Sequence, residues 1–134
     1  MEISGGCLCG GTQYVLASVP YSLADCHCID CRRAAGAPSV CWGTVSREDL
    51  FVIRGQVRKI SHANRIRSFA SCCGTPLFFE DSSEASTIDI TIASLDDPGR
   101  FSPQKVIWLE DKLPWAVINE SLPSFQQQSP SSLK

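Results

Sequence analysis

Cys26-His27-Cys28-Ile29-Asp30-Cys31-Arg32-Arg33 is the stretch around which we expect the chain to fold. Three thiols within six residues bring their sulfur atoms close enough to bind one cation, and thiolate is the soft ligand that zinc prefers. Three protein ligands leave one position of a tetrahedral zinc free, and a water or a substrate sulfur can fill it. Because an open position distinguishes a catalytic zinc from a structural one, Cys26, Cys28 and Cys31 are the candidate catalytic ligands.

The other polar residues of this stretch have two interpretations each. His27 is an alternative fourth ligand that would close the site, but on an extended chain its side chain points away from its two cysteine neighbours. Asp30 either orders the turn through backbone N–H groups or is merely exposed. Arg32 and Arg33 either offset the thiolate charge and bind a carboxylate of a substrate, or are solvated surface cations.

The remaining cysteines favour metal binding over disulfides. Eight cysteines in 134 residues suit either a disulfide framework in an exported protein or metal and thiol chemistry in the cytoplasm. Seven of them lie in tight clusters. Besides the three in residues 26–31, Cys7 and Cys9 are separated by one residue and Cys72 is adjacent to Cys73. Such pairs cannot bridge to each other without strained rings. We expect Cys41, in an apolar stretch, to be a buried small hydrophobic residue.

Composition excludes several classes of protein. A hydrophobic fraction of 43% and a charged fraction of 19% are ordinary for one globular domain. A net charge of −2, with the 12 Lys and Arg residues scattered, disfavours nucleic acid as a partner. No apolar run approaches the ~20 residues of a membrane helix, and the first six residues do not resemble a signal peptide. The sequence therefore predicts a cytoplasmic protein without a membrane partner.

Short runs of β-forming residues predict an all-β fold. About eight strands separated by turn residues are indicated, and no helical pattern of ten or more residues occurs. Residues 88–92 alternate isoleucine with polar residues, which predicts a strand with one buried face. Residues 32–36 predict one helical turn that ends at Gly36. The domain is expected over residues 1–122, followed by a Ser-, Gln- and Pro-rich tail, 123–134, that we expect to be disordered.

Several stretches, taken in order, match one family. They are Gly6-Cys7-Leu8-Cys9-Gly10, residues 26–33 with Gly36, Cys73-Gly74-Thr75-Pro76-Leu77, Leu95-Asp96-Asp97-Pro98 and Trp115. With these residues the chain resembles, over roughly residues 3–117, the glutathione-dependent formaldehyde-activating enzyme family, which also includes centromere protein V. The resemblance implies an Mss4-like fold, in which antiparallel sheets are pinned by cysteine–zinc turns.

The resemblance also implies two zinc sites. Cys26, Cys28 and Cys31 would hold the catalytic Zn²⁺, while Cys7 and Cys9 would join a later C-x-x-C motif in a structural site. The sequence departs from this pattern in Phe69-Ala70-Ser71-Cys72-Cys73-Gly74, where Ala70 replaces the first cysteine of the later motif. Three outcomes are open: Cys72 turns in as a ligand beside Cys73, the site holds zinc with three thiolates and a water, or the site is empty.

The implied activity is that of a carbon–sulfur lyase or synthase. Such an enzyme would act on the adduct of a thiol like glutathione with a small aldehyde like formaldehyde, namely S-hydroxymethylglutathione. Zinc with a free position lowers the pKa of a bound thiol, and thiolate is the form that attacks a carbonyl. The alternative is a non-catalytic, zinc-stabilised module that binds a protein partner, which predicts a closed fourth position and an exposed apolar patch. Trp42, Trp108 and Trp115 belong either to the core or to the aromatic wall of a pocket.

Overall fold

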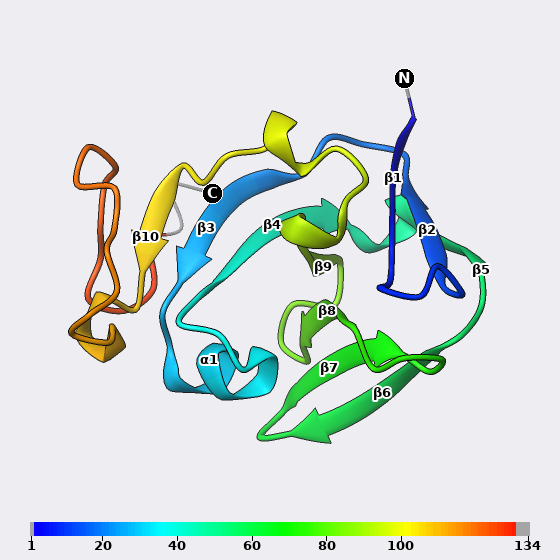
Figure 1. The fold of residues 1–134 in the computed structure, drawn as a ribbon, viewed down its shortest axis with the longest axis horizontal. Coiled ribbons are helices and arrows are strands. Elements are labelled where there is room, and N and C mark those ends of the chain that lie inside the picture. The colour runs from blue at the N-terminus through cyan, green and yellow to red at the C-terminus, as the bar shows by residue number, and fades with distance from the viewer. Residues whose placement is uncertain (1, 131–134) are drawn as a thin grey trace.

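Two β-sheets and one short helix make up the computed structural model, which describes residues 2–130 (Figure 1). The smaller sheet has the antiparallel order β1-β2-β5, with β1 (Ile3–Gly6), β2 (Gln13–Leu16) and β5 (Leu50–Arg54). The larger sheet has the order β10-β3-β4-β9-β8-β7-β6. Its strands are β3 (Tyr21–Cys26), β4 (Val40–Ser46), β6 (Val57–His62), β7 (Arg65–Ala70), β8 (Pro76–Asp81), β9 (Thr87–Thr91) and β10 (Lys105–Ile107).

The predicted all-β fold is confirmed. Neighbouring strands of the larger sheet are antiparallel, except that β10 runs parallel to β3. Four 3-10 helices lie in the connections described, at Arg47–Asp49, Ile92–Ser94, Pro98–Arg100 and Leu109–Asp111. No helix among residues 2–130 has the length and apolar character needed to cross a membrane.

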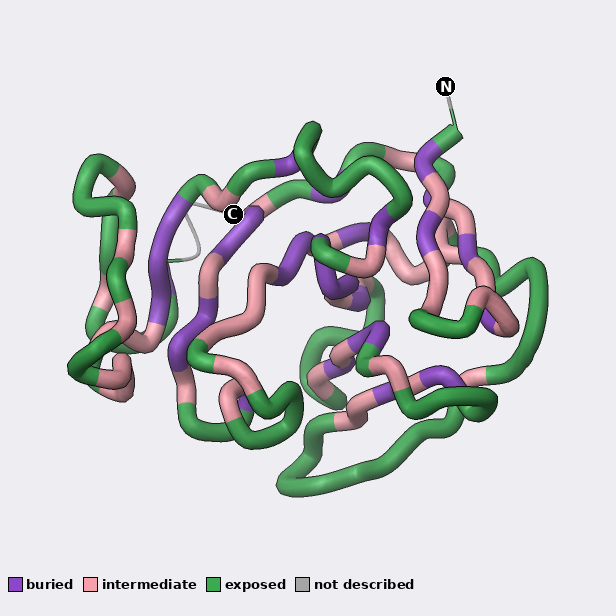
Figure 2. Tube along the Cα trace, viewed as in Figure 1, coloured by how far each residue is buried: buried purple, intermediate pink, exposed green. Residues whose placement is uncertain are grey.

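The main apolar core lies where the two sheets meet. Ile3, Tyr14 and Leu16 of the smaller sheet belong to one buried cluster with Phe78 and Ile90 of the larger sheet. The rings of Tyr14 and Phe78 meet edge to face with centroids 5.1 Å apart, a favoured aromatic geometry. Ile88 and Ile90 are buried as the alternation of β9 predicts. In Figure 2 the buried residues follow the inner strands, while β6 at the edge of its sheet is largely exposed.

The helix α1 (Ile29–Ala35) starts earlier than the sequence indicated. Cys28 is its N-cap, because the Cys28 sulfur accepts a hydrogen bond from the backbone N–H of Cys31 at 3.2 Å. The helix ends as predicted at Gly36, which adopts the left-handed conformation with φ of +63° and donates its N–H to the carbonyl of Arg32.

Part of the segment expected to form the tail lies against β10 and the residues that follow it. Polar composition predicted disorder, but Val106 of β10 donates its N–H to the Pro123 carbonyl at 2.9 Å and accepts from the Phe125 N–H at 2.9 Å. Phe125 also packs against a second apolar cluster that contains Ala24 and Ile107. Because β10 is an edge strand of its sheet, its outer backbone groups can pair with a passing segment whatever the composition of that segment. Residues 131–134 of the expected tail lie outside the described residues.

Candidate metal centres and the adjoining cleft

The sulfur atoms of Cys26, Cys28 and Cys31 form one compact group and lie within 4.8 Å of one another. Cys26 is the last residue of β3, and the next residues turn directly into α1. Cys28 at the N-cap and Cys31 one turn later share a face of the helix, which is the i, i+3 relation. The strand-to-helix turn thus brings the three predicted ligands together.

The fourth position of this group has no side-chain ligand within residues 2–130. No further histidine, cysteine or carboxylate belongs to the group there. His27 is buried, and its Nε2 atom lies 3.2 Å from Oδ2 of Asp25. The arrangement is therefore a three-thiol group, as the sequence indicated, with His27 bonded elsewhere.

The three thiols share negative charge unequally. Hydrogen bonds from Cys26 and Cys28, with smaller effects from Trp42 and Arg67, hold the pKa of Cys31 well below the usual range of a thiol. Contacts with Cys28 and Cys31, together with burial, raise the pKa of Cys26 far above that range. Without a cation, one sulfur of the group is ionised in preference to the others, whereas a bound divalent cation would favour three thiolates.

A cleft of about 730 Å³ opens beside the three-thiol group. Its aromatic lining is Trp42, Phe79 and Trp108, and the rings of Trp42 and Phe79 lie 5.7 Å apart. Two of the three tryptophans therefore border the cleft, whereas Trp115 is 67% exposed and is not part of its lining. Charged residues also line the cleft, and these are Asp30, Arg65, Arg67, Asp81, Glu84, Asp89, Lys105 and Asp111.

Arg67 is the cation closest to the thiols among the contacts described, and sequence reasoning did not identify it. Its Nη2 atom lies 3.9 Å from the Cys31 sulfur, and its guanidinium lies over the Phe79 ring at 4.8 Å from the centroid. Within the described chain, Arg32 and Arg33 do not line the cleft, although they were the predicted cations. Arg67 reaches the cleft because β7 pairs with β8, where Arg67 is opposite Phe79. This pairing joins separate segments of the chain, so no local sequence motif indicates the position of Arg67.

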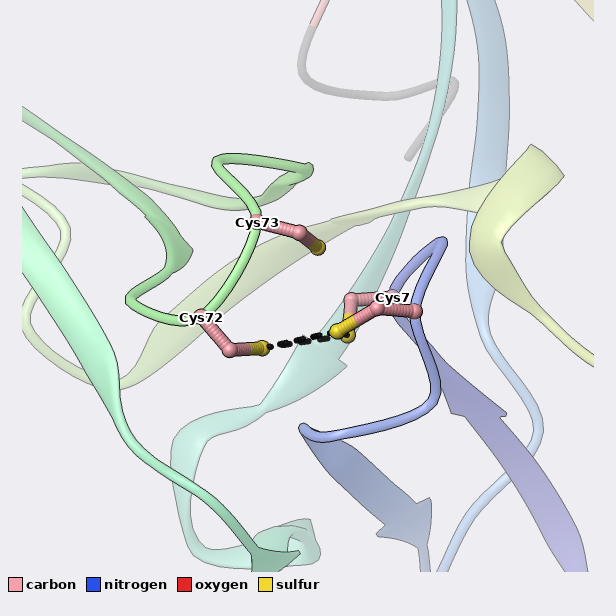
Figure 3. A group of neighbouring side chains, drawn as sticks. Cys7, Cys72 and Cys73 are labelled. Carbon is pink, nitrogen blue, oxygen red and sulfur yellow. Dashed lines mark hydrogen bonds between the residues drawn. The ribbon is translucent and has the colours of Figure 1, made fainter.

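A second group unites Cys7, Cys9, Cys72 and Cys73, whose sulfur atoms all lie within 4.8 Å of one another. The sulfur of Cys72 lies 3.5 Å from that of Cys7 and 3.3 Å from that of Cys9, and the sulfurs of Cys7 and Cys9 are 3.7 Å apart. Zinc–sulfur bonds of about 2.3 Å in a tetrahedron place sulfurs about 3.8 Å apart, so the donor set fits zinc. In Figure 3 the side chains of Cys72 and Cys73 both point from their turn toward Cys7.

The local backbone explains how adjacent cysteines reach one centre. Ala70 is fully buried at the end of β7, and its carbonyl accepts a hydrogen bond from the Gly74 N–H at 2.8 Å. The chain is therefore a tight turn over residues 71–74, with Gly74 at a φ of +77°, and not an extended segment. The side chains of neighbouring residues point in opposite directions only where the chain is extended. In this turn the side chains of Cys72 and Cys73 can therefore point toward the same centre. Of the three open outcomes, the geometry favours Cys72 beside Cys73.

Hydrogen-bond donors surround this second group. The N–H of Thr12 donates to the Cys7 sulfur at 3.2 Å, and that of Gly11 donates to the Cys9 sulfur at 3.4 Å. Thr75 contributes its hydroxyl 3.2 Å from the Cys73 sulfur; this contact, with backbone N–H donors, lowers the pKa of Cys73 to about 6. Thr75 is a second residue that sequence reasoning left without a role, although it follows the Cys73-Gly74 dipeptide directly.

Comparisons with known proteins identify the family of the chain and a structure with a similar fold. The family model described as glutathione-dependent formaldehyde-activating enzyme matches residues 2–111. A crystal structure of a Rhodobacter sphaeroides protein is similar with a TM-score of 0.54 and 22% identity, and the match covers 69% of this chain and 87% of that one. At this identity the likeness shows the fold alone. No curated protein matches the chain. On the match over residues 2–111, the chain belongs to the glutathione-dependent formaldehyde-activating enzyme family.

Proposed function

We propose that the chain is a zinc-dependent carbon–sulfur lyase or synthase that acts on the adduct of a thiol with a small aldehyde. The observation that carries the proposal is the three-thiol group of Cys26, Cys28 and Cys31, which lines a cleft and lacks a fourth side-chain ligand within residues 2–130. Family membership supports the same reaction class. Thiol addition to an aldehyde needs an ionised sulfur next to a space that admits a small carbonyl compound. The cleft offers the space, and a cation on the three-thiol group would keep the sulfur of a substrate thiol ionised.

The residues present fit zinc as the resident cation. Three sulfur donors within 4.8 Å suit a soft divalent ion, and they leave a place for one more ligand. A zinc ion bound there would supply a Lewis acid that keeps a substrate thiol ionised at neutral pH. Three thiolates exceed the charge of the ion by one, and Arg67, 3.9 Å from the Cys31 sulfur, offsets part of this excess.

The proposed reaction is balanced without a redox partner. The substrate thiol gives up its proton to water, and the thiolate lone pair forms a sulfur–carbon bond to the carbonyl carbon of formaldehyde. The carbonyl π pair moves to oxygen, which takes a proton back from water, so no net proton is gained or lost. The lyase direction reverses each of these movements. A cleft of about 730 Å³ is large enough for a thiol of tripeptide size, so we propose glutathione or a similar thiol as the substrate.

For the second group we propose a structural zinc held by Cys7, Cys9, Cys72 and Cys73. Four sulfurs within 4.8 Å of one another are enough to fill all four positions of a tetrahedral zinc, which would close the site to substrates. Backbone donors from Gly11 and Thr12 stabilise the thiolate form.

The decisive experiment compares Cys28→Ser with Cys41→Ala. Zinc content is measured by mass spectrometry, and the formation of S-hydroxymethylglutathione is followed by exchange NMR. Cys28→Ser is expected to lower the catalysed rate by about 100-fold or more and to remove about one zinc per chain, since it removes a proposed ligand. Cys41→Ala should keep both, because Cys41 belongs to neither sulfur group among the described residues. Equal rates for Cys28→Ser and the wild type would refute the enzymatic proposal.

A protein-binding module is the second candidate, favoured by the exposed apolar side chains of β5. Phe51, Val52 and Ile53 are 50%, 40% and 60% exposed, and β5 is an edge strand that offers backbone groups to an added peptide strand. This candidate requires a closed catalytic site. X-ray absorption of the zinc protein before and after addition of a thiol distinguishes the two, because an open site exchanges its fourth, lighter ligand for sulfur whereas a closed site keeps its ligands.

A further inference from the structure

We propose that Arg67 binds a carboxylate of the substrate, so that the cleft selects thiols that carry a carboxylate close to the sulfur. This inference rests on the proposed function, since it assumes that a thiol occupies the fourth position beside Cys26, Cys28 and Cys31. It adds a specificity-determining residue and a chemical class of substrate.

The position of Arg67 is fixed by the sheet. Arg67 of β7 is directly opposite Phe79 of β8, and its guanidinium lies over that ring at 4.8 Å from the centroid. Stacking on an aromatic ring orients the guanidinium plane and leaves the N–H groups at its rim free to bind other groups. One of these, on Nη2, lies 3.9 Å from the Cys31 sulfur. The guanidinium is therefore held at the boundary between the thiol group and the cleft.

Arg67 has donors to spare. A guanidinium carries five N–H groups, and the contact with Cys31 involves one of its nitrogens. Over residues 2–130, Arg47 pairs with Glu80 and Arg100 pairs with Asp97, but no ion pair joins Arg67 to a carboxylate. Arg67 is half-buried, lines the cleft and has N–H groups that pair with no protein carboxylate among the described residues. Its guanidinium fork can therefore bind the carboxylate of a ligand through two parallel hydrogen bonds.

The other charged residues of the cleft leave few places where a carboxylate can bind, and Arg67 is at one of them. Asp30, Asp81, Glu84, Asp89 and Asp111 line the same cleft and disfavour an anion near them. Lys105 is buried, and its Nζ donates to the hydroxyls of Ser22 and Ser129 at 2.8 Å each. Arg65 and Arg67, two positions apart on β7, thus form the cationic side of the cleft, and of these two Arg67 has the contact with the thiol group.

The geometry limits how far the carboxylate can be from the sulfur. With zinc–sulfur bonds of about 2.3 Å, a sulfur in the fourth position lies about 3.8 Å from that of Cys31. A carboxylate on the Arg67 fork then lies roughly 4–8 Å from the substrate sulfur, given hydrogen bonds of about 2.8 Å. A short mercapto acid spans this distance, which allows a test with simple probes.

The test compares 3-mercaptopropionate with 2-mercaptoethanol, which has a hydroxyl in place of the carboxylate. Binding of each probe to the zinc-loaded protein is measured by titration calorimetry for the wild type, Arg67→Gln, Arg67→Lys and Arg65→Gln. We expect the wild type to bind 3-mercaptopropionate about 10-fold more tightly than 2-mercaptoethanol, the effect of one charge-assisted pair. Arg67→Gln should lose this preference while its affinity for 2-mercaptoethanol changes less than about twofold, and Arg67→Lys should retain part of it.

The controls separate the possible failures. Arg54→Gln, on the exposed β5 and outside the cleft lining, should keep the preference. Arg65→Gln removes the other cation of the cleft wall and should lower the preference less than Arg67→Gln, because Arg67 has the contact with the thiol group. Three outcomes would overturn the role of Arg67 and leave the proposed reaction intact. They are equal binding of the two probes to the wild type, an unchanged preference in Arg67→Gln, and loss of the preference in Arg65→Gln alone. Binding of neither probe to zinc-loaded protein would instead overturn the thiol site itself. Zinc content and circular dichroism of each variant establish that it is folded and loaded.

Discussion

At the scale of single residues, Cys72 belongs to the four-sulfur group for which the resemblance implied a cysteine at position 70. The turn over residues 71–74 brings its sulfur to 3.5 Å from that of Cys7, while Ala70 is fully buried in the core. The Thr12 hydroxyl lies 3.3 Å from the Cys72 sulfur and adds a polar contact at the same point. A changed ligand position is thus compatible with an intact four-sulfur group.

Cys72→Ser is expected to lower the zinc content by about one ion per chain after dialysis against a weak chelator. Serine is a poor ligand for zinc, and three remaining thiolates bind it less tightly than four. Metal analysis by mass spectrometry checks this, with Cys41→Ala as the matched control. Unchanged zinc content in Cys72→Ser would mean that Cys72 is not a ligand.

Tyr14 links a single side chain to the pH dependence of stability. Burial raises the pKa of Tyr14 to about 12, and its hydroxyl hydrogen-bonds to Ser94 at 2.6 Å. Since the folded state favours the neutral phenol, this stability is complete below about pH 10 and is lost as the pH rises from about 10 to about 12. The loss is about 2–3 kcal/mol relative to Tyr14→Phe, measured by urea unfolding across this range. Parallel pH profiles for the two proteins would contradict the assignment.

At the scale of elements, the segment that begins at Pro123 lies beside β10, the edge strand of the larger sheet, and forms one bridge with it. Its backbone pairs with β10, where Val106 forms hydrogen bonds with both Pro123 and Phe125. Phe125 adds apolar contact with the cluster that includes Cys26, Cys31 and Trp42. The segment also contributes Gln128 and Ser129 to the lining of the cleft, next to Lys105 and Ile107 of β10.

Phe125→Ala is expected to destabilise the protein by about 1–2 kcal/mol, because a half-buried aromatic ring loses its apolar contacts. Hydrogen exchange of the backbone amides of Phe125 and Val106 should accelerate in the variant. Phe51→Ala, at a residue 50% exposed on β5, is the matched control and should cost less. An equal effect of the two substitutions would show that the tail does not pack as described.

At the scale of the whole molecule, the two sulfur groups differ in what they connect. Cys26, Cys28 and Cys31 lie within one strand-to-helix turn. Cys7 and Cys72 are 65 positions apart, and their group joins the turn after β1 to the turn between β7 and β8. Closing a long loop removes more entropy from the unfolded chain than closing a short one, so the four-sulfur group is the one expected to stabilise the fold.

The midpoint of thermal unfolding should therefore fall more in Cys72→Ser than in Cys28→Ser. We expect the difference to be several degrees, since about 1 kcal/mol corresponds to about 3–6 °C in a domain of this size. Excess chelator should abolish the difference between the wild type and Cys72→Ser, because both proteins then lack the metal. A larger fall in Cys28→Ser would reverse the structural assignment.

Much of the fold and of the candidate site could be predicted from the sequence. Strand alternation such as that of Ile88 and Ile90, the helix end at Gly36 and the spacing of Cys26, Cys28 and Cys31 are all local properties, because each depends on residues within one or two turns of chain. They indicated the all-β class and the three-thiol group without any knowledge of packing.

The sequence by itself thus determined that Cys26, Cys28 and Cys31 form one group and that the chain folds mainly as strands. Only the tertiary structure decided that Arg67 lies beside Cys31, that Cys72 joins Cys7 and Cys9, and that residues 123–125 pair with Val106 of β10. The physical reason is that these contacts depend on strand order and register between distant segments. Side-chain neighbours across a sheet are set by the pairing of whole strands, which no local pattern of residues encodes.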